Sequence, residues 1–282
     1  MKNIVIIPNS KKDSGLRVTS KLCDKLLSLG ATVYIEEAYA GFAENANTYK
    51  EFPENAELIV VVGGDGSLLD ASVIAIEKDI PLVGVNLGKV GYLSEVETDE
   101  LDFFARIFTG EYTIEERLLL SVSYTAEGKT VSSERLAVND VIISHDTFLG
   151  IADFTLETEK RHKVKYRADG MIISTPQGST AYNLSAGGPI VGHDIEAIVA
   201  TPICPHSFFN RSIIFNSSEV LKIKNIGEPE LKLSLDGRAL ADISNGGECI
   251  IKIADKKLKI LTFSKSNMFQ TLFRKMRLFE EI

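Results

Sequence analysis

A run of three glycines and one aspartate, Gly63-Gly64-Asp65-Gly66, carries the clearest chemical signal in the chain. The apolar residues 58–62 before it predict a buried strand, and the residues after it predict a helix. Glycines have no Cβ, so a phosphate can approach their backbone closely, and the first N–H groups of a helix point toward one place. The segment from Leu58 to Ala71 therefore predicts a phosphate-binding turn between a strand and a helix.

Asp65 lies where the phosphate of a ligand is expected, which leaves two roles for its carboxylate. It either caps the helix or accepts a proton from a hydroxyl group that attacks phosphorus. A plain tight turn with Asp65 as the cap is the alternative without chemistry. Two other phosphate-binding patterns do not fit, because Ser67-Leu68 replaces the Lys-Ser/Thr of a P-loop and Leu69 replaces the last glycine of a G-x-G-x-x-G fingerprint.

A second segment, residues 167–189, runs from a strand-like start into a dense set of Ser, Thr, Gln, Asn and Gly residues. These donors and acceptors suit a ligand with many hydroxyl groups and rings, and Tyr182 can stack on such a ring. Arg167 and Asp169 are two residues apart, so on a strand they share one face. The alternatives are an exposed ion pair for these two residues and a purely structural turn for the polar run.

Asn139 and Asp140 stand directly before another apolar strand. Two neighbouring acceptors suit the vicinal hydroxyl groups of a ribose, and the alternative is an ordinary pair of turn residues. The histidines show no spacing typical of a metal site, so we predict no metal ion held by protein ligands; they are His145, His162, His193 and His206.

Strand and helix patterns alternate in the first part of the chain. Residues 2–7 and 31–36 predict strands on either side of a helix at 14–29. We therefore predict an α/β domain over residues 1–112. Short alternating segments separated by turns predict an all-β, β-sandwich-like domain over residues 113–262, with helices near 178–197. Residues 263–282 predict an amphipathic helix that packs on the first domain or on a neighbouring subunit.

The composition of the 282-residue chain excludes several classes of protein. Its net charge of −8 argues against a nucleic-acid backbone as the partner, since that binding depends on clustered Lys and Arg. The three cysteines form neither a disulfide framework nor a zinc pattern. The N-terminus has no signal-peptide pattern, and no window approaches the roughly 20 apolar residues of a membrane span. We therefore predict a cytoplasmic protein, and the acidic balance does not argue against small anionic ligands, because a local pocket of backbone N–H groups can hold phosphate.

Several segments together resemble the bacterial-type NAD kinases, also called ATP-NAD kinases. The glycine run alone is shared with lipid kinases and phosphofructokinase-like enzymes, whereas the long polar segment is highly specific to this family. The matching pieces occur in the order of the family over about residues 58–240; they are LIVVVGGDGSLL, NLGKVGYLSE, VNDVII, DGMIISTPQGSTAYNLSAGGPIV, TPICPHSF and SLDGR.

The resemblance implies an α/β N-terminal domain, a β-sandwich-like C-terminal domain and a last helix that returns to the first domain. It implies phosphorylation of the 2′-hydroxyl of the adenosine ribose of NAD by ATP, giving NADP and ADP, with Asp65 as the catalytic base. The residues expected to bind NAD are Asp65, Gly66, Asn139, Asp140, Arg167, Asp169, Thr180, Ala181, Tyr182, Asn183, Leu184, Ser185, Cys204 and Arg238. The residues expected to position the ATP phosphates are Gly63, Gly64, Gly66, Asn86, Gly88, Lys89 and Gly91.

The resemblance also implies an assembly and a metal ion. Family members work as dimers or tetramers with NAD held between subunits, and Mg²⁺ is expected to arrive with ATP, bound mainly by phosphates and water. Tyr92, Cys204 and Arg238 depart from the commonest pattern or vary, which affects fine substrate preference and not the reaction. The alternatives are a lipid-type or other small-molecule kinase with the same glycine turn, and a non-catalytic sensor of NAD.

Overall fold

The computed structural model describes residues 2–88, 91, 93–126, 128–146, 150–160, 162–206 and 210–263. These residues form two compact units, each with its own core. Unit 1 contains the chain up to Glu116 together with the segment that begins at Leu258, and unit 2 is Arg117–Lys257. The predicted tail helix, residues 263–282, lies outside the described residues except for Phe263.

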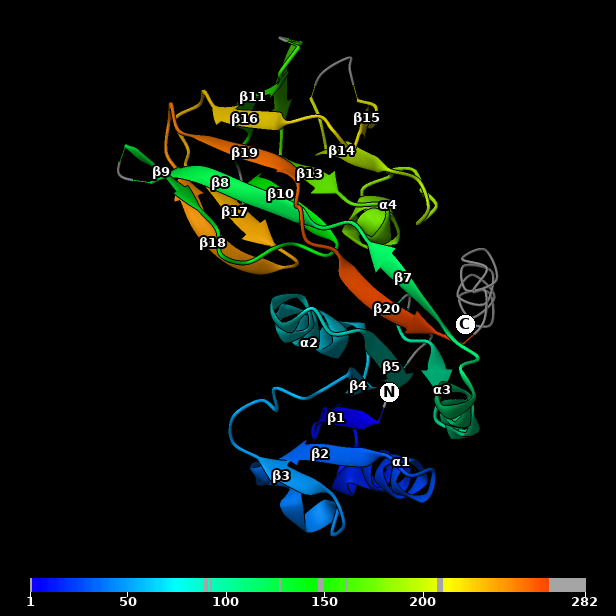
Figure 1. Cartoon of the computed structure of the whole chain (residues 1–282). Helices are drawn as coiled ribbons and strands as arrows, with labels where there is room; N and C mark the ends of the chain where they lie inside the picture. The colour runs from blue at the N-terminus through cyan, green and yellow to red at the C-terminus, as the bar shows by residue number, and fades with distance from the viewer. Residues whose placement is uncertain are drawn as a thin grey trace, which may run out of the picture. The chain divides into compact units, whose positions relative to one another are not determined.

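Unit 1 is built on a largely parallel sheet with the strand order β3-β2-β1-β4-β5-β20-β7, and β6 pairs with β5 (Figure 1). Its strands are β1 Asn3–Pro8, β2 Thr32–Glu36, β3 Asn47–Tyr49, β4 Leu58–Gly63, β5 Leu82–Asn86, β6 Val96–Glu97, β7 Thr113–Arg117 and β20 Leu258–Thr262. Its helices are α1 Arg17–Ser28, α2 Asp65–Lys78 and α3 Ala105–Thr109, and its 3-10 turns are η1 Ser14–Leu16, η2 Glu37–Phe42 and η3 Leu101–Phe104.

Helices cover both faces of this sheet, which explains why its central strands are apolar throughout. Every residue of β4 is buried, as expected for a parallel strand covered on both sides. Leu22 and Leu26 of α1 join the core cluster that contains Val60 and Val62 of β4, whereas α2 packs against β4, β5 and β20. Gly84 of β5 permits this close approach, because a Cβ there would lie 2.7 Å from Leu68 of α2. The glycine turn at the start of α2 is therefore fixed to the sheet.

Unit 2 consists of two antiparallel six-stranded sheets, ordered β15-β14-β13-β10-β17-β18 and β12-β11-β16-β19-β8-β9. One core cluster joins side chains of both sheets, including Ile143 of β10 and Phe154 of β11, so the unit is a β-sandwich. Its strands are β8 Leu120–Ala126, β9 Lys129–Ser132, β10 Asp140–His145, β11 Ala152–Thr158, β12 Lys163–Ala168, β13 Gly170–Ser174, β14 Ala197–Ile203, β15 Ile213–Asn216, β16 Leu221–Asn225, β17 Leu231–Leu235, β18 Arg238–Ile243 and β19 Glu248–Ile253. Two short helical turns follow β13, η4 Gln177–Thr180 and α4 Tyr182–Ser185.

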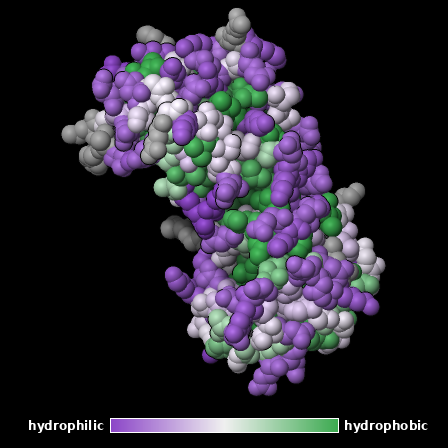
Figure 2. All heavy atoms as spheres, turned by 60° about the vertical axis from the view of Figure 1, so that its left-hand side comes forward, coloured by the Kyte–Doolittle hydropathy of each residue, from purple (hydrophilic) through white to green (hydrophobic). Residues whose placement is uncertain are grey.

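The predicted fold class, an α/β domain followed by a β-sandwich-like domain, is confirmed. The sheet of unit 1 also takes β7 and β20, which the boundaries at 112/113 and 262/263 assign to the second domain. Their alternating residues fit a strand in either domain, and only the pairing of β20 with β5 decides between them. Among the described residues, no helix is long and apolar enough to cross a membrane. Hydrophilic side chains make up much of the face shown in Figure 2.

Candidate active site

The glycine turn forms as predicted, between the last residue of β4 and the first turn of α2. Gly63 ends β4 and pairs with Asn86 at the end of β5, and Gly64 is the N-cap residue of α2. A Cβ on Gly63 would lie 2.5 Å from the Ser67 hydroxyl oxygen, so no larger residue fits without moving the helix start. The N–H groups of Ser67 and Leu68 both donate to the Gly64 carbonyl, at 2.8 and 3.1 Å, so the first turn of α2 closes directly on the glycine turn.

Asp65 is the first residue of α2, directly after the N-cap residue Gly64. Its half-buried carboxylate accepts hydrogen bonds at Oδ1 from the backbone N–H of Leu93, at 3.2 Å, and from the Ser94 hydroxyl, at 3.4 Å. Gly91 also lies close to this carboxylate, since a Cβ there would be 2.3 Å from the same oxygen. The loop after β5 thus holds the carboxylate in place.

The predicted phosphate-binding residues of this loop lie beside the glycine turn. Asn86 is buried; its side chain accepts the N–H of Gly88 at 3.1 Å and donates to both carboxylate oxygens of Glu97 at 3.2 Å. Lys89 lies outside the described residues. The structure therefore brings together the glycine turn, Asn86, Gly88 and Gly91 at one edge of the sheet.

Sequence reasoning missed two residues at this edge, Asn9 and Lys12. The Asn9 amide donates to the Ser67 hydroxyl at 2.7 Å, and a Cβ on Gly64 would lie 2.8 Å from the Lys12 ammonium nitrogen. Both residues follow β1, which is the parallel neighbour of β4. The loops after such neighbouring strands flank the position where ligands bind in open α/β sheets. The order of the strands was the missing information, because the loop itself, NSKKD, has no distinctive motif.

Asn139 and Asp140 lie at the start of β10 in unit 2. The Thr175 hydroxyl donates to the Val138 carbonyl at 2.7 Å, and the Thr175 N–H donates to the Asn139 carbonyl at 2.9 Å. Asp140 is buried, with 4% of its surface exposed. Burial, and secondarily the nearby Asp236 carboxylate, raise the pKa of Asp140 to about 7. Its charge therefore changes near neutral pH.

The polar run 177–185 packs against this pair. A Cβ on Gly178 would lie 2.0 Å from the Asn139 carbonyl oxygen, so only glycine allows η4 to approach. The Asn183 side chain is fully buried; it donates to the carbonyls of Ser179 and Pro189 and accepts from the Thr201 hydroxyl. Its amide holds the run together. The neighbouring side chains have different exposures: Thr180 is buried, Ala181 is intermediate, and Tyr182, Leu184 and Ser185 are exposed.

Asp169 precedes β13 and Cys204 follows β14, at the end of β13 that is opposite to the polar run 177–185. Arg167 lies on the preceding strand, β12. The Asp169 N–H donates to the Ile203 carbonyl at 3.0 Å, and its side chain lies 3.5 Å from Nε2 of His145, the last residue of β10. The expectation that Arg167 and Asp169 share a strand face is wrong. Arg167 belongs to β12, and the chain passes to β13 of the other sheet at Asp169. Arg238 lies at the opposite end, next to the turn that contacts Asn139.

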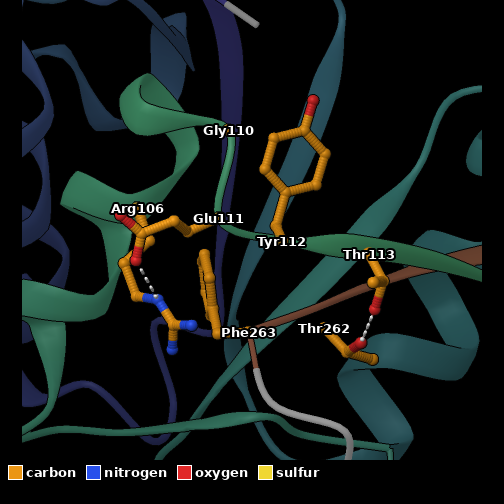
Figure 3. A pocket seen from close by; sticks show the side chains of 7 residues that line it. All are labelled: Arg106, Gly110, Glu111, Tyr112, Thr113, Thr262 and Phe263. Atoms are coloured by element: carbon orange, nitrogen blue, oxygen red, sulfur yellow. Dashed lines mark hydrogen bonds and ion pairs between the residues drawn. The ribbon is translucent and has the colours of Figure 1, made fainter.

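The site described above is separate from a cavity of about 450 Å³ in unit 1, which none of the predicted site residues lines. Figure 3 shows its wall, where the hydroxyls of Thr113 and Thr262 lie 2.7 Å apart. The other lining residues are Arg106, Gly110, Glu111, Tyr112 and Phe263. Within the described residues, no group of His, Cys, Asp and Glu side chains is arranged to hold a metal ion.

The fold and the candidate site together indicate a broad class of protein. A glycine turn with an aspartate in the first turn of its helix, on an α/β unit followed by a β-sandwich rich in polar groups, is typical of a two-domain kinase that acts on a small molecule. The family models identify the class further. Residues 4–112 match the ATP-NAD kinase N-terminal domain, and residues 138–263 match the ATP-NAD kinase C-terminal domain. The chain belongs to the ATP-NAD kinase family.

Individual relatives and solved structures agree with this assignment. The chain is 37% identical to the NAD kinase of Lachnoclostridium phytofermentans, over 96% of this chain and 98% of the relative. It is 34% identical to the NAD kinase of Natranaerobius thermophilus, over 98% of each. The fold is shared with yeast NADH kinase complexed with NADH, with a TM-score of 0.86, 23% identity, and coverage of 98% of this chain and 88% of that one. It is also shared with an NAD kinase from Archaeoglobus fulgidus in complex with ATP, with a TM-score of 0.71, 23% identity, and coverage of 98% and 99%.

Proposed function

We propose that this chain is an NAD kinase, which transfers the γ-phosphoryl group of ATP to the 2′-hydroxyl of the adenosine ribose of NAD and forms NADP and ADP. The observation that carries the proposal is the position of the Asp65 carboxylate, which stands in the first turn of α2 beside the glycine turn and accepts hydrogen bonds from Leu93 and Ser94. A carboxylate at this position can accept the proton of a substrate hydroxyl group. Membership of the family supplies the substrate class.

Asp65 acts as the general base in this mechanism. It accepts the proton of the 2′-hydroxyl while the oxygen attacks the γ-phosphorus in line with the leaving ADP. The backbone N–H groups of the glycine turn bind phosphate oxygens, and Asn86, Gly88, Lys89 and Gly91 belong to the loop that completes this edge. Lys12 adds a positive charge beside Gly64 and offsets the charge of the phosphates.

Mg²⁺ fits this site as part of the ATP complex. The glycine turn offers N–H groups and an ammonium group, which bind phosphate and repel a cation. The phosphate oxygens and water would therefore hold the metal, and it supplies further neutralisation of charge on the transferred group.

The sandwich unit supplies the NAD-binding residues in this proposal. Asn139 and Asp140 bind ribose hydroxyl groups, and the exposed ring of Tyr182 stacks on a ring of the dinucleotide. Thr180, Ala181, Leu184 and Ser185 line the same run, and Arg238 lies beside the pair. The Asn183 amide supports this surface from inside, because chain groups already occupy its hydrogen-bonding positions.

We further propose that the chain works as a dimer or tetramer, as the family resemblance implies. Asp140 and Ser144, which pair with Ser174 and Gly170, are four residues apart along β10, so the two polar clusters of unit 2 lie roughly 14 Å apart at about 3.4 Å per residue. In this proposal Arg167, Asp169 and Cys204 contact NAD that is bound mainly by a neighbouring copy. The exposed Ile195 and Ile214, near edge strand β15, suit such an interface. We place the protein in the cytoplasm, where both substrates occur.

The test is the formation of NADP by the purified chain with NAD, ATP and Mg²⁺, followed with an NADP-specific coupled enzyme. A lipid-type kinase would leave NAD unchanged and phosphorylate a lipid, and residues 167–189 are too polar for a hydrophobic substrate channel. A non-catalytic sensor would bind NAD in a calorimetric titration and form no NADP. Either of these results would refute the proposed reaction.

A further inference from the structure

The SLDGR motif forms a tight hairpin turn between β17 and β18, and its aspartate has an unusual backbone conformation. Asp236 and Gly237 both have positive φ, at 47° and 74°, as a two-residue type I′ turn requires. Asp-Gly is one of the preferred sequences of this turn, so a further role of the Asp236 side chain has to follow from its contacts.

The Asp236 carboxylate binds the backbone that carries Asn139 and Asp140. Its Oδ2 accepts the N–H of Val138 at 2.9 Å, and its Oδ1 accepts the N–H groups of Asn139 and Asp140 at 2.8 and 3.2 Å. In return, the Asp236 N–H donates to the Asp140 carbonyl at 3.0 Å. One side chain thus satisfies three consecutive N–H groups, and charged acceptors make the stronger hydrogen bonds.

Thr175 holds the same segment by its carbonyl groups, as described above. The peptide groups of residues 138–140 are therefore fixed from both sides, by a carboxylate at the N–H groups and by Thr175 at the carbonyls. Since backbone conformation determines where side chains point, this double clamp fixes the directions of the Asn139 and Asp140 side chains.

Asp236 also sets the electrostatic surroundings of Asp140. Burial is the main cause of the raised pKa of Asp140, and the Asp236 charge adds to it. Burial raises the pKa of Asp236 as well, while its three backbone N–H donors and the nearby Arg135 act in the opposite direction. These are the charged groups that face the pair. A neutral residue at 236 would remove one source of repulsion from Asp140.

We propose that Asp236 is a positioning residue for NAD, which holds residues 138–140 so that Asn139 and Asp140 present their side chains to the dinucleotide. This inference rests on the proposed function. It assigns a role to a residue whose carboxylate binds the backbone of residues 138–140 and that lies far from the pair in sequence. Loss of the clamp is therefore predicted to weaken the binding of NAD and to leave the binding of ATP unchanged.

The test compares three variants in the NADP-forming assay and in calorimetric titrations with NAD. Asp236→Asn keeps the size of the side chain but turns its amide donor toward the Val138 N–H. Asp236→Gly suits the type I′ turn and removes the carboxylate altogether. Asp242→Asn is the matched control, because Asp242 lies on the same hairpin, is exposed and forms an ion pair with the Lys232 side chain opposite it.

We expect both Asp236 variants to raise the KM and the Kd for NAD about tenfold or more. The KM for ATP and kcat at saturating NAD should stay close to those of Asp242→Asn, while the melting temperature falls modestly because three N–H groups lose their charged acceptor. In Asp236→Asn, the pH dependence of kcat/KM for NAD should move to lower pH, because Asp140 loses a negative neighbour.

Unchanged NAD affinity in both Asp236 variants would overturn the proposal. A joint loss of kcat, ATP affinity and thermal stability would overturn it as well, since that pattern indicates a purely structural residue. A wild-type chain that forms no NADP would instead contradict the proposed reaction, and the NAD titrations of the same variants would still decide the role of Asp236.

Discussion

Replacing Gly91 by alanine tests how closely catalysis depends on the position of the Asp65 carboxylate. A Cβ at residue 91 would lie 2.3 Å from Oδ1 of Asp65 and 2.6 Å from the Ser94 hydroxyl, whereas ordinary contacts begin at 3.4 Å. The carboxylate must therefore move by about 1 Å, and a misplacement of that size in a catalytic group costs about 10²-fold in rate. Both crowded atoms are at the ends of side chains that can rotate, so the folded state should lose little stability.

The assay measures kcat for NADP formation at saturating NAD and ATP, with a thermal melt of the same preparation. We expect Gly91→Ala to lower kcat about 10²-fold and to change the melting temperature by less than about 3 °C. Gly41→Ala is the control in the same unit, because a Cβ at Gly41 meets no atom within 4 Å. In an Asp65→Asn background, Gly91→Ala should cost almost nothing further, since the group it displaces is already inactive. Near-normal kcat in the single variant, or a full additional loss in the double variant, would refute this reasoning.

Two other predictions concern unit 2. Burial raises the pKa of Asp140 to about 7, and its ionised form accepts hydrogen bonds from ribose hydroxyls, so kcat/KM for NAD should increase roughly tenfold from about pH 6 to about pH 8. Asp140→Asn should remove that rise. A flat pH profile of the wild type would argue against the role assigned to Asp140. Gly178→Ala places a Cβ 2.0 Å from the Asn139 carbonyl oxygen, and the clash is hard to relieve because both partners are backbone segments. We expect the melting temperature to fall by about 5 °C and the KM for NAD to increase more than tenfold. An unchanged melting temperature and KM would contradict the described packing of Gly178 on Asn139.

Local patterns predicted the elements of unit 1 well, because each signal lies within a few residues. The apolar run 58–62 became β4, and the glycines after it became the turn before α2. Gly30 follows α1 with φ at 86°, and the N–H of Ala31 returns to the Leu26 carbonyl, which matches the predicted glycine at the helix end. Such features need no knowledge of the rest of the chain.

Features that depend on pairing between distant strands could not be predicted. Lys12 reaches the glycine turn only because β1 lies beside β4. Asp236 reaches Asn139 only because β17 pairs with β10. Arg167 and Asp169 looked like neighbours on one strand, but the chain changes sheets between them. In each case the missing information was the order of strands in a sheet, which periodicity does not contain.

The resemblance to a family predicted residues that physical patterns alone left open. The polar run 177–185 also fits a purely structural turn, and the Asn183 amide indeed donates to two backbone carbonyls of the chain. Local pattern also left the choice between capping and catalysis at Asp65 open; the family resemblance favours catalysis, and the Asp65→Asn variant tests it.

The central claim is tested most directly by measuring two quantities on the Asp65→Asn variant, its kcat for NADP formation and its Kd for NAD. The exchange removes the base and keeps the size of the side chain, so kcat for NADP formation should fall by about 10²- to 10⁴-fold. The calorimetric Kd for NAD should stay within about threefold of that of the wild type, since Asn139, Asp140 and Tyr182 are unchanged. Near-normal turnover with intact NAD binding would contradict the assignment of Asp65 as the group that accepts the proton of the 2′-hydroxyl.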